Sequence, residues 1–182
     1  MTTTRSLSIA LTGSGGAGAM TAGELLLDAA AAHGWYGIMS RSFGPQIRGG
    51  EAAALVRLAA APVEGPDDAY DVLVALDWGN VERFAAEIPL QPDSLVLADP
   101  AHGEVPAVIA ASGARIVEVP LSELARALRG GRANMVALGL VARMAGLSAD
   151  CLREGVARRF GDKGGAAVET ARAAVDAGYA HE

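Results

Sequence analysis

The chain has 182 residues, of which 51% are hydrophobic and 20% are charged, so it is long enough to bury one substantial core and too apolar to be disordered throughout. Its formal charge of −6, with arginines scattered along the chain, argues against a nucleic-acid-binding protein, which needs a clustered basic face. Its single cysteine, Cys151, excludes an intrachain disulfide and a cysteine-held iron–sulfur cluster or zinc site.

The sequence shows no pattern typical of a membrane span or a secretion signal. Residues 1–6 lead into no long apolar stretch with a cleavage site, and no apolar run approaches the roughly 20 residues that cross a bilayer. A lone cysteine that packs as a small apolar residue suits a reducing compartment. We therefore expect a cytoplasmic protein that contacts no membrane.

Strand-like and helix-like patterns alternate along most of the chain. The expected strands are apolar runs at residues 7–12, 36–39, 52–58, 70–76, 93–98 and 114–119. The expected helices lie at residues 19–33, 81–87, 120–128, 134–145, 149–160 and 166–177. This alternation predicts an α/β fold: a Rossmann-like three-layer sandwich with a mainly parallel sheet, extra C-terminal helices and a single domain over residues 1–182. Polar residues at alternate positions place the strand at 114–119 on a sheet edge.

A glycine-rich turn joins the first expected strand to the first expected helix. The turn consists of Gly13, Ser14, Gly15, Gly16, Ala17 and Gly18. A strand that enters such a turn and leaves as a helix brings backbone N–H groups and the positive helix end together, which favours a bound phosphate. The alternative is a turn whose glycines serve only close packing of helix on strand.

The residues at the end of the second expected strand help to identify the phosphate compound that the glycine turn would bind. A nicotinamide site needs an acidic residue there for the ribose hydroxyls, and residues 39–42 contain none. Arg41 stands there instead. It either meets a phosphate on the ribose, as NADP and coenzyme A both carry, or is a solvated surface residue.

The loop at residues 42–50 is the second unusual element, and we expect it to emerge beside the glycine turn at the same sheet edge. It begins at Ser42, turns at Gly44 and Pro45, and carries Arg48 just before Gly49. A guanidinium held in a tight turn suits a phosphate or carboxylate. The alternative is a turn that packs on a neighbour, with Arg48 in a structural salt bridge.

Together the two motifs resemble a known family. Gly-x-Gly-Gly-x-Gly at 13–18, followed by Ser-Phe-Gly-Pro-Gln-Ile-Arg-Gly-Gly at 42–50, resembles the gamma subunit or gamma domain of the 2-oxoacid:ferredoxin oxidoreductases, which include the pyruvate, 2-oxoglutarate, 2-oxoisovalerate and indolepyruvate enzymes. The resemblance continues through residues 71–77, 134–139, 160–163 and 173–180. The chain departs from the family at Ala17, where Gln is usual, and at Gln46, where Glu is usual.

The resemblance implies a role in a multisubunit enzyme that decarboxylates a 2-oxo acid oxidatively and captures the acyl group on coenzyme A. It implies coenzyme A on or near this chain, held by the glycine turn, by residues of the 41–49 segment and by Asn134. It places thiamine diphosphate, Mg²⁺ and iron–sulfur clusters on partners, namely thiamine-binding alpha- and beta-type subunits and a cluster-bearing subunit or ferredoxin. The isolated chain is then expected to be inactive.

Outside these motifs, no pattern indicates a nucleophile, a general base or a metal site. The three histidines are spread along the sequence, at His33, His102 and His181. His102 beside Asp99 is either a proton relay or part of an exposed turn. Asp77, after the strongest strand, either faces the edge where ligands gather or caps the next helix. Asn134 either hydrogen-bonds the cofactor or caps the helix that it opens.

Two other functions compete with the subunit hypothesis. An independent NADP-type dinucleotide-binding oxidoreductase would need no partner, and the missing acid and the lack of a catalytic residue weigh against it. A nucleotide-binding regulator would bind a ligand tightly without turnover. The sequence does not name the 2-oxo acid or the electron acceptor.

Overall fold

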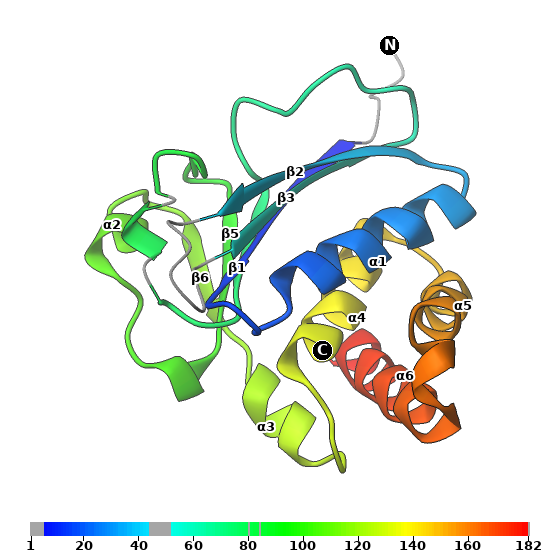
Figure 1. The fold of residues 1–182 in the computed structure, drawn as a ribbon. Helices are drawn as coiled ribbons and strands as arrows, with labels where there is room; N and C mark the ends of the chain where they lie inside the picture. Colours follow the sequence, from blue (N-terminus) through cyan, green and yellow to red (C-terminus); the bar gives the residue numbers. More distant parts are fainter. Residues whose placement is uncertain (1–5, 44–51, 80, 84, 182) are drawn as a thin grey trace.

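The computed structural model describes residues 6–43, 52–79, 81–83 and 85–181 (Figure 1). Over these residues the chain forms one six-stranded sheet in the order β2-β3-β1-β4-β5-β6. Its strands are β1 (Ser6–Gly13), β2 (Tyr36–Phe43), β3 (Ala52–Ala59), β4 (Val72–Ala75), β5 (Leu95–Ala98) and β6 (Arg115–Glu118). The strand β6 lies on the sheet edge, which confirms the interpretation of its alternating polar residues.

The sheet is parallel from β1 through β4 and β5 to β6, and antiparallel where β3 pairs with β1 and β2. A parallel crossover needs about a dozen residues or more, usually including a helix. Only residues 44–51 separate β2 from β3, so β3 returns antiparallel to its predecessor. The α/β prediction is confirmed, with a mixed sheet.

The strand β2 runs to Phe43, four residues beyond the predicted end at residue 39. It does so because its pairing with β3 continues to Phe43 opposite Ala52. Ala52 is also opposite Gly13, the last residue of β1. The ends of β1 and β2 and the start of β3 therefore meet at the same end of the sheet. The glycine turn leaves β1 at this end, while residues 44–50 of the second loop lie outside the described residues.

Helices cover both faces of the sheet (Figure 1). They are α1 (Ala19–Ala32), α2 (Ala107–Ala110), α3 (Leu121–Arg126), α4 (Ala133–Ala145), α5 (Ala149–Phe160) and α6 (Gly165–Ala180), with short 3-10 turns η1 (Val81–Arg83), η2 (Pro100–His102) and η3 (Gly161–Lys163). None of the helices in the described ranges is long and apolar enough to cross a membrane.

The helix expected at residues 81–87 is wrong, because η1 is the only helical turn among the described residues of that segment. The segment lies between Gly79 and Pro89, and the residue before a proline is driven away from the helical conformation. So short a stretch also gains too few hydrogen bonds to offset the cost of starting a helix. The buried side chains of Val81 and Ile88 instead pack on the sheet face that α2 covers.

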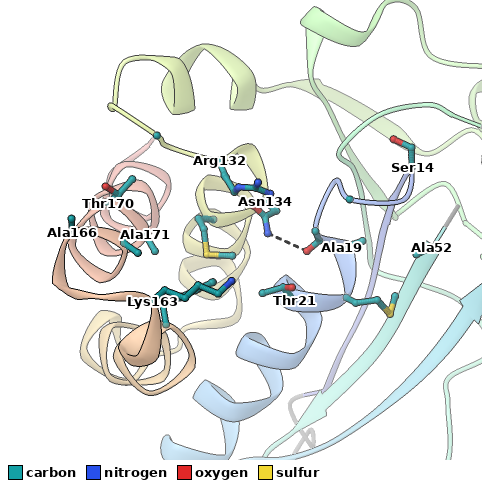
Figure 2. Close-up of a pocket in the computed structure, with 17 residues that line it drawn as sticks. Ser14, Ala19, Thr21, Ala52, Arg132, Asn134, Lys163, Ala166, Thr170 and Ala171 are labelled. Atoms are coloured by element: carbon teal, nitrogen blue, oxygen red, sulfur yellow. Dashed lines mark hydrogen bonds between the residues drawn. The ribbon is translucent and has the colours of Figure 1, made fainter. Parts of the chain in front are cut away.

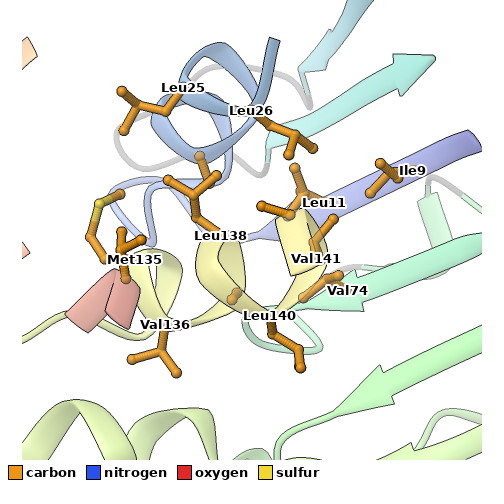
Figure 3. Close-up of a cluster of buried hydrophobic side chains, with 14 of the residues drawn as sticks. Ile9, Leu11, Leu25, Leu26, Val74, Met135, Val136, Leu138, Leu140 and Val141 are labelled. Carbon is orange, nitrogen blue, oxygen red and sulfur yellow. The ribbon is translucent and has the colours of Figure 1, made fainter. Parts of the chain in front are cut away.

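The strand β1 divides its side chains between two cores. Ile9 and Leu11 enter the larger core, whereas Ala10 enters the smaller one on the opposite face, as the two-residue period of a strand requires. Figure 3 shows Leu25 and Leu26 of α1 converging with Leu138 of α4 over β1. This packing fixes the start of α4 beside the start of α1.

Two glycines set how closely α6 approaches α4. A Cβ atom at Gly139 would collide with the carbonyl of Val175, and one at Gly178 would collide with the carbonyl of Val136. The two helix backbones are therefore in direct contact. This contact holds α6 across from α1, with a space between them.

Candidate functional site

A cavity of about 660 Å³ lies between the glycine turn and the C-terminal helices. Its walls include the first turns of three helices: Ala19 to Thr21 of α1, Asn134 and Met135 of α4, and Ala166 and Ala167 of α6 (Figure 2). This volume is in the range of small-molecule binding sites, which is about 300–1,000 Å³. The cavity is the candidate site.

The described lining of the cavity carries positive charge and no acidic residue. Arg132 precedes α4 and Lys163 ends η3, and both line the cavity. Within the described residues neither cation has an acidic partner, and the Nζ atom of Lys163 lies 5.1 Å from the centroid of the Phe160 ring. Two unneutralised cations in a chain of net charge −6 favour an anionic ligand.

The three helices that begin at the cavity have no side-chain cap. The residues before them, Gly18, Arg132 and Gly164, make no capping hydrogen bond, whereas Ser148 caps α5 through the N–H of Asp150. The first N–H groups of a helix have no partner inside it and carry partial positive charge. The uncapped starts of α1, α4 and α6 therefore add to the attraction for an anion.

Asn134 joins the two sides of the cavity. The residue is 3% exposed, and its Nδ2 atom donates to the carbonyl of Gly18 at 3.1 Å (Figure 2). Gly18 has a φ of +92°, and a Cβ atom there would collide with Asn134. The Oδ1 atom of Asn134 is buried without a hydrogen-bond partner among the described residues. The capping alternative for Asn134 is wrong, because Arg132 is the N-cap of α4 and makes no side-chain capping bond.

Asp77 at the end of β4 binds the glycine turn. Its Oδ2 atom accepts from the Ser14 N–H at 2.9 Å and from the Ser14 hydroxyl at 2.7 Å, and its Oδ1 atom accepts from the Gly79 N–H at 2.9 Å. The Ser14 donors are thus already engaged, and the carboxylate disfavours an anion close to them. The other end of the turn, around Gly16, Gly18 and the start of α1, is the better place for a phosphate.

Arg41 and Ser42 lie on β2 and not in the described lining of the cavity. The Arg41 guanidinium is 2.7 Å from Oε1 of Glu24, and Oε2 of the same residue is 3.2 Å from Arg159. Because Arg41 is paired with Glu24, Arg41 gives no support to the alternative in which it binds the ribose phosphate of NADP.

The structure brings part of the predicted site together. Four of the predicted residues line the cavity: Ser14, Gly16, Gly18 and Asn134. Gly13, Gly15 and Ala17 belong to the same turn but not to the described lining. Three predicted residues lie outside the described residues: Gly44, Arg48 and Gly49.

The sequence reasoning missed the two cations and the apolar side of the cavity. Arg132 follows Gly130 and Gly131, the same arginine-beside-glycine pattern that singled out Arg48, so a signal was present. Lys163 is the single lysine of the sequence and ends the Phe-Gly-Asp-Lys segment. The apolar lining by Met20, Met135 and Phe160 has no local signature.

His102 does not form a proton relay between Ser122 and Asp99. Its Nε2 atom lies 3.3 Å from the Ser122 hydroxyl and 4.0 Å from the Asp99 carboxylate, so one ring nitrogen faces both groups. A relay uses the two ring nitrogens separately. The buried Asp99 carboxylate instead accepts from the N–H groups of Ala101 and Ser122. No group of acidic, histidine or cysteine residues that could hold a metal occurs in the described part of the chain.

Comparison with known proteins agrees with the resemblance noted from the motifs. The family described as pyruvate ferredoxin/flavodoxin oxidoreductase matches residues 8–181. The ketoisovalerate oxidoreductase subunit VorA of Methanothermobacter thermautotrophicus is 30% identical over 159 residues, which cover 85% of this chain and 32% of that protein. VorA of Methanothermobacter marburgensis is 28% identical, over 87% of this chain and 33% of that protein. The chain thus spans about a third of the length of these curated relatives.

Solved structures share the fold. The 2-oxoglutarate:ferredoxin oxidoreductase of Magnetococcus marinus, with 2-oxoglutarate, coenzyme A and succinyl-CoA bound, is 28% identical with a TM-score of 0.83, over 97% of this chain and 31% of that one. The keto/oxoacid ferredoxin oxidoreductase gamma subunit of Geobacter sulfurreducens is 26% identical with a TM-score of 0.75, over 96% of this chain and 95% of that one. The pyruvate oxidoreductase subunit PORC of Thermotoga maritima shares the fold at 20% identity, with a TM-score of 0.74 over 96% of each chain.

The match over residues 8–181 covers nearly the whole sequence, including the glycine turn and all three helix starts at the cavity. The chain therefore belongs to the pyruvate ferredoxin/flavodoxin oxidoreductase family.

Proposed function

We propose that this chain is the gamma-type component of a 2-oxoacid:acceptor oxidoreductase and that its cavity binds coenzyme A. The observation that carries the proposal is a cavity of about 660 Å³ whose described lining holds two cations, three uncapped helix starts and no acid. The similar 2-oxoglutarate:ferredoxin oxidoreductase of Magnetococcus marinus has coenzyme A bound, which supports this choice of ligand.

The residues present fit the phosphates of coenzyme A. Arg132 and Lys163 would neutralise phosphate charge, and the N–H groups at the start of α1 would donate to phosphate oxygens. Bound coenzyme A supplies the thiol that accepts the acyl group. Gly44, Arg48 and Gly49 stay predicted contributors beyond the described residues.

The function proposed for this chain is positioning and not covalent chemistry. By holding the anionic part of coenzyme A, it would keep the thiol near a thiamine-bound intermediate on a partner subunit. Fixing two reactants in this way makes their reaction effectively unimolecular, which can contribute about 7–11 kcal/mol to lowering a barrier in well-oriented cases. We propose that thiamine diphosphate, Mg²⁺ and iron–sulfur clusters lie on the partners. For the clusters the reason is that the single cysteine of this chain cannot hold a four-cysteine cluster.

The test is steady-state kinetics of the complex purified anaerobically with this chain. Arg132→Ala and Lys163→Ala should each raise the KM for coenzyme A roughly 10- to 100-fold, because each removes a charge-assisted contact of about 1.5–3 kcal/mol. The 2-oxo-acid-dependent half-reaction without coenzyme A should keep its rate. Arg158→Ala is the matched control, since the Arg158 side chain is 60% exposed and, among the described residues, pairs with Glu154 alone.

An unchanged KM in both variants would refute the proposed site. Arg48→Ala, tested in the same assay, asks whether the second loop takes part. We expect it to raise the KM for coenzyme A as well, because Arg48 lies beside glycines that allow close approach of a ligand.

A further inference from the structure

Glu24 of α1 is bonded to two arginines that come from distant parts of the sequence. Its Oε1 atom accepts from the Arg41 guanidinium at 2.7 Å, and its Oε2 atom accepts from the Arg159 guanidinium at 3.2 Å. Arg41 lies on β2 and Arg159 near the end of α5. Each carboxylate oxygen thus serves one arginine, and the side chain of Glu24 links three elements.

Both partners of the Glu24–Arg159 pair are close in sequence to residues that line the cavity. Thr21, which lines it, is three residues before Glu24 on α1, a spacing at which helix residues share a face. Arg159 directly precedes Phe160 and stands four residues before Lys163, and both of these line the cavity. Figure 2 shows the amine of Lys163 extending toward Thr21. The pair therefore joins α1 to the segment that carries Lys163.

The apolar packing of α5 on α1 leaves the end of α5 for Glu24 to fix. Gly155 is buried, and a Cβ atom there would lie 3.6 Å from Cδ2 of Leu25, so this small residue lets α5 approach α1. Such a contact sets the distance between two helices but has little directional preference, whereas a hydrogen bond is directional. Arg159 is one turn further along α5, where its bond to Glu24 sets how that end lies on α1.

We infer that Glu24 is a positioning residue of the coenzyme A site; this inference rests on the proposed function. Through Arg159 it holds the end of α5, and with it Phe160 and Lys163, opposite the first turn of α1. Glu24 itself does not belong to the described lining of the cavity. It acts on the ligand through the place that it gives to the Lys163 amine.

The charges around Glu24 fit this role. A lone carboxylate beside the cavity would repel phosphate groups, but two guanidinium groups share this one, so the three side chains carry one net positive charge. Arg41 then contributes without touching the ligand. By occupying Oε1 it keeps Oε2 directed at Arg159, because the bond removes freedom from a flexible side chain.

Positioning and simple neutralisation predict opposite results for Glu24→Gln. If Glu24 only neutralised its arginines, its loss would free positive charge and lower the KM for coenzyme A. Loss of the positioning contact should instead raise this KM in the anaerobically purified complex about 3- to 10-fold, with kcat at saturating coenzyme A changed by less than about twofold. Glu154→Gln is the matched control, because it removes a carboxylate of α5 that pairs with Arg158 at 3.8 Å. It should leave the KM unchanged.

A second measurement needs neither coenzyme A nor a partner subunit. Lys163 is the single lysine of the sequence, so amine-reactive labelling of the full chain, followed by peptide mass spectrometry, reports on this one side chain. The N-terminal amine serves as the internal reference. Glu24→Gln and Arg159→Gln break the same contact, and each should raise the labelling rate of Lys163 about 2- to 5-fold, because the amine is then less restrained. Glu154→Gln should not change it.

Coupling between Glu24 and Lys163 separates positioning from a general loss of structure. In a Lys163→Gln background, Glu24→Gln should raise the KM for coenzyme A by less than about twofold, because the side chain through which Glu24 acts is gone. A general loosening of the fold would raise the KM in that background as much as in the wild type.

The outcomes separate this inference from the proposed function. If Lys163→Ala raises the KM for coenzyme A but Glu24→Gln leaves it unchanged or lowers it, the inference is overturned and the proposed function stands. The same holds if the labelling rate of Lys163 is unaltered in Glu24→Gln, or if the effect of Glu24→Gln persists in the Lys163→Gln background. If the KM is unaltered in the Arg132 and Lys163 variants, the proposed function itself fails, and the inference fails with it.

Discussion

The two walls of the cavity contribute different things to it. The wall formed by the glycine turn and α1 supplies backbone N–H groups, and the carboxylate of Asp77 binds its Ser14. The wall formed by α4, η3 and α6 supplies Arg132 and Lys163. A glycine motif thus provides the shape of an anion site, while its positive side chains come from segments more than a hundred residues later.

The hydrogen bond from Asn134 to the carbonyl of Gly18 joins the two walls. Gly18→Ala should break this bond, and of the variants considered it should have the largest effect on stability. A methyl group there would collide with Asn134 at a φ of +92°. Strain and overpacking together should lower the free energy of unfolding by about 3 kcal/mol. Urea unfolding measures this loss.

Gly16→Ala is the matched control in the same turn. Gly16 has a φ of +95° but no atom near its would-be Cβ, so it bears only the conformational cost of about 1–2 kcal/mol. Equal losses in the two variants would show that Asn134 does not join the walls as described.

The positive wall should make coenzyme A binding depend on salt. The affinity of the wild-type chain should fall as ionic strength rises from about 0.1 M to about 1 M, since screening shortens the reach of charges from about 10 Å to about 3 Å. The double variant Arg132→Gln/Lys163→Gln should bind weakly and lose most of that dependence. A double variant with the wild-type salt response would place the important charges elsewhere.

Asp77 should affect stability more than ligand binding. Asp77→Ala removes the acceptor of three described donors, the N–H and hydroxyl of Ser14 and the N–H of Gly79, and we expect a loss of about 1–2 kcal/mol in the free energy of unfolding. Its effect on the affinity for coenzyme A should stay within a few-fold. Thermal unfolding measures the effect on stability, and calorimetric titration of the same sample measures the effect on coenzyme A affinity. A large loss of affinity with unchanged stability would contradict a mainly structural role for Asp77.

Tyr70, on the sheet face away from both walls, should give the smallest effect. Burial, and next the charge of Glu87, raise the pKa of its phenol above 10.0. Because the folded state prefers the neutral phenol, its contribution to stability is full below about pH 10 and is lost as pH rises through the folded-state pKa. Urea midpoints across this window should fall less steeply in Tyr70→Phe. If the urea midpoints of the wild type and of Tyr70→Phe fall equally steeply with pH, the raised pKa of Tyr70 is contradicted.

Sequence alone located the first wall because its signals are local. The strand, the glycine turn and the helix follow one another in β1 and α1, and the apolar patterns predicted both elements to within two residues. The true length of β2 and the short η1 depend on pairing with β3 and on core packing, which local patterns do not contain. The predicted site was therefore most accurate near Gly16 and Gly18.

Apart from Asn134, the second wall was not predicted, because tertiary packing assembles it. Lys163 ends η3, which leads into α6, and Gly139 and Gly178 allow α6 to lie directly against α4. Nothing in the residues around Lys163 indicates that neighbour. The two glycines before Arg132 could have marked it as a candidate in the sequence. Its position near the glycine turn, however, results from the folded structure and not from the sequence around it.

The central claim is that coenzyme A lies between these two walls, with its phosphates on the positive one. A crystal structure of the full chain grown with saturating coenzyme A tests it most directly. We expect phosphate oxygens within hydrogen-bond distance of Arg132 and Lys163 and close to the start of α1. Ordered coenzyme A at another surface, with this cavity holding only solvent, would contradict the account.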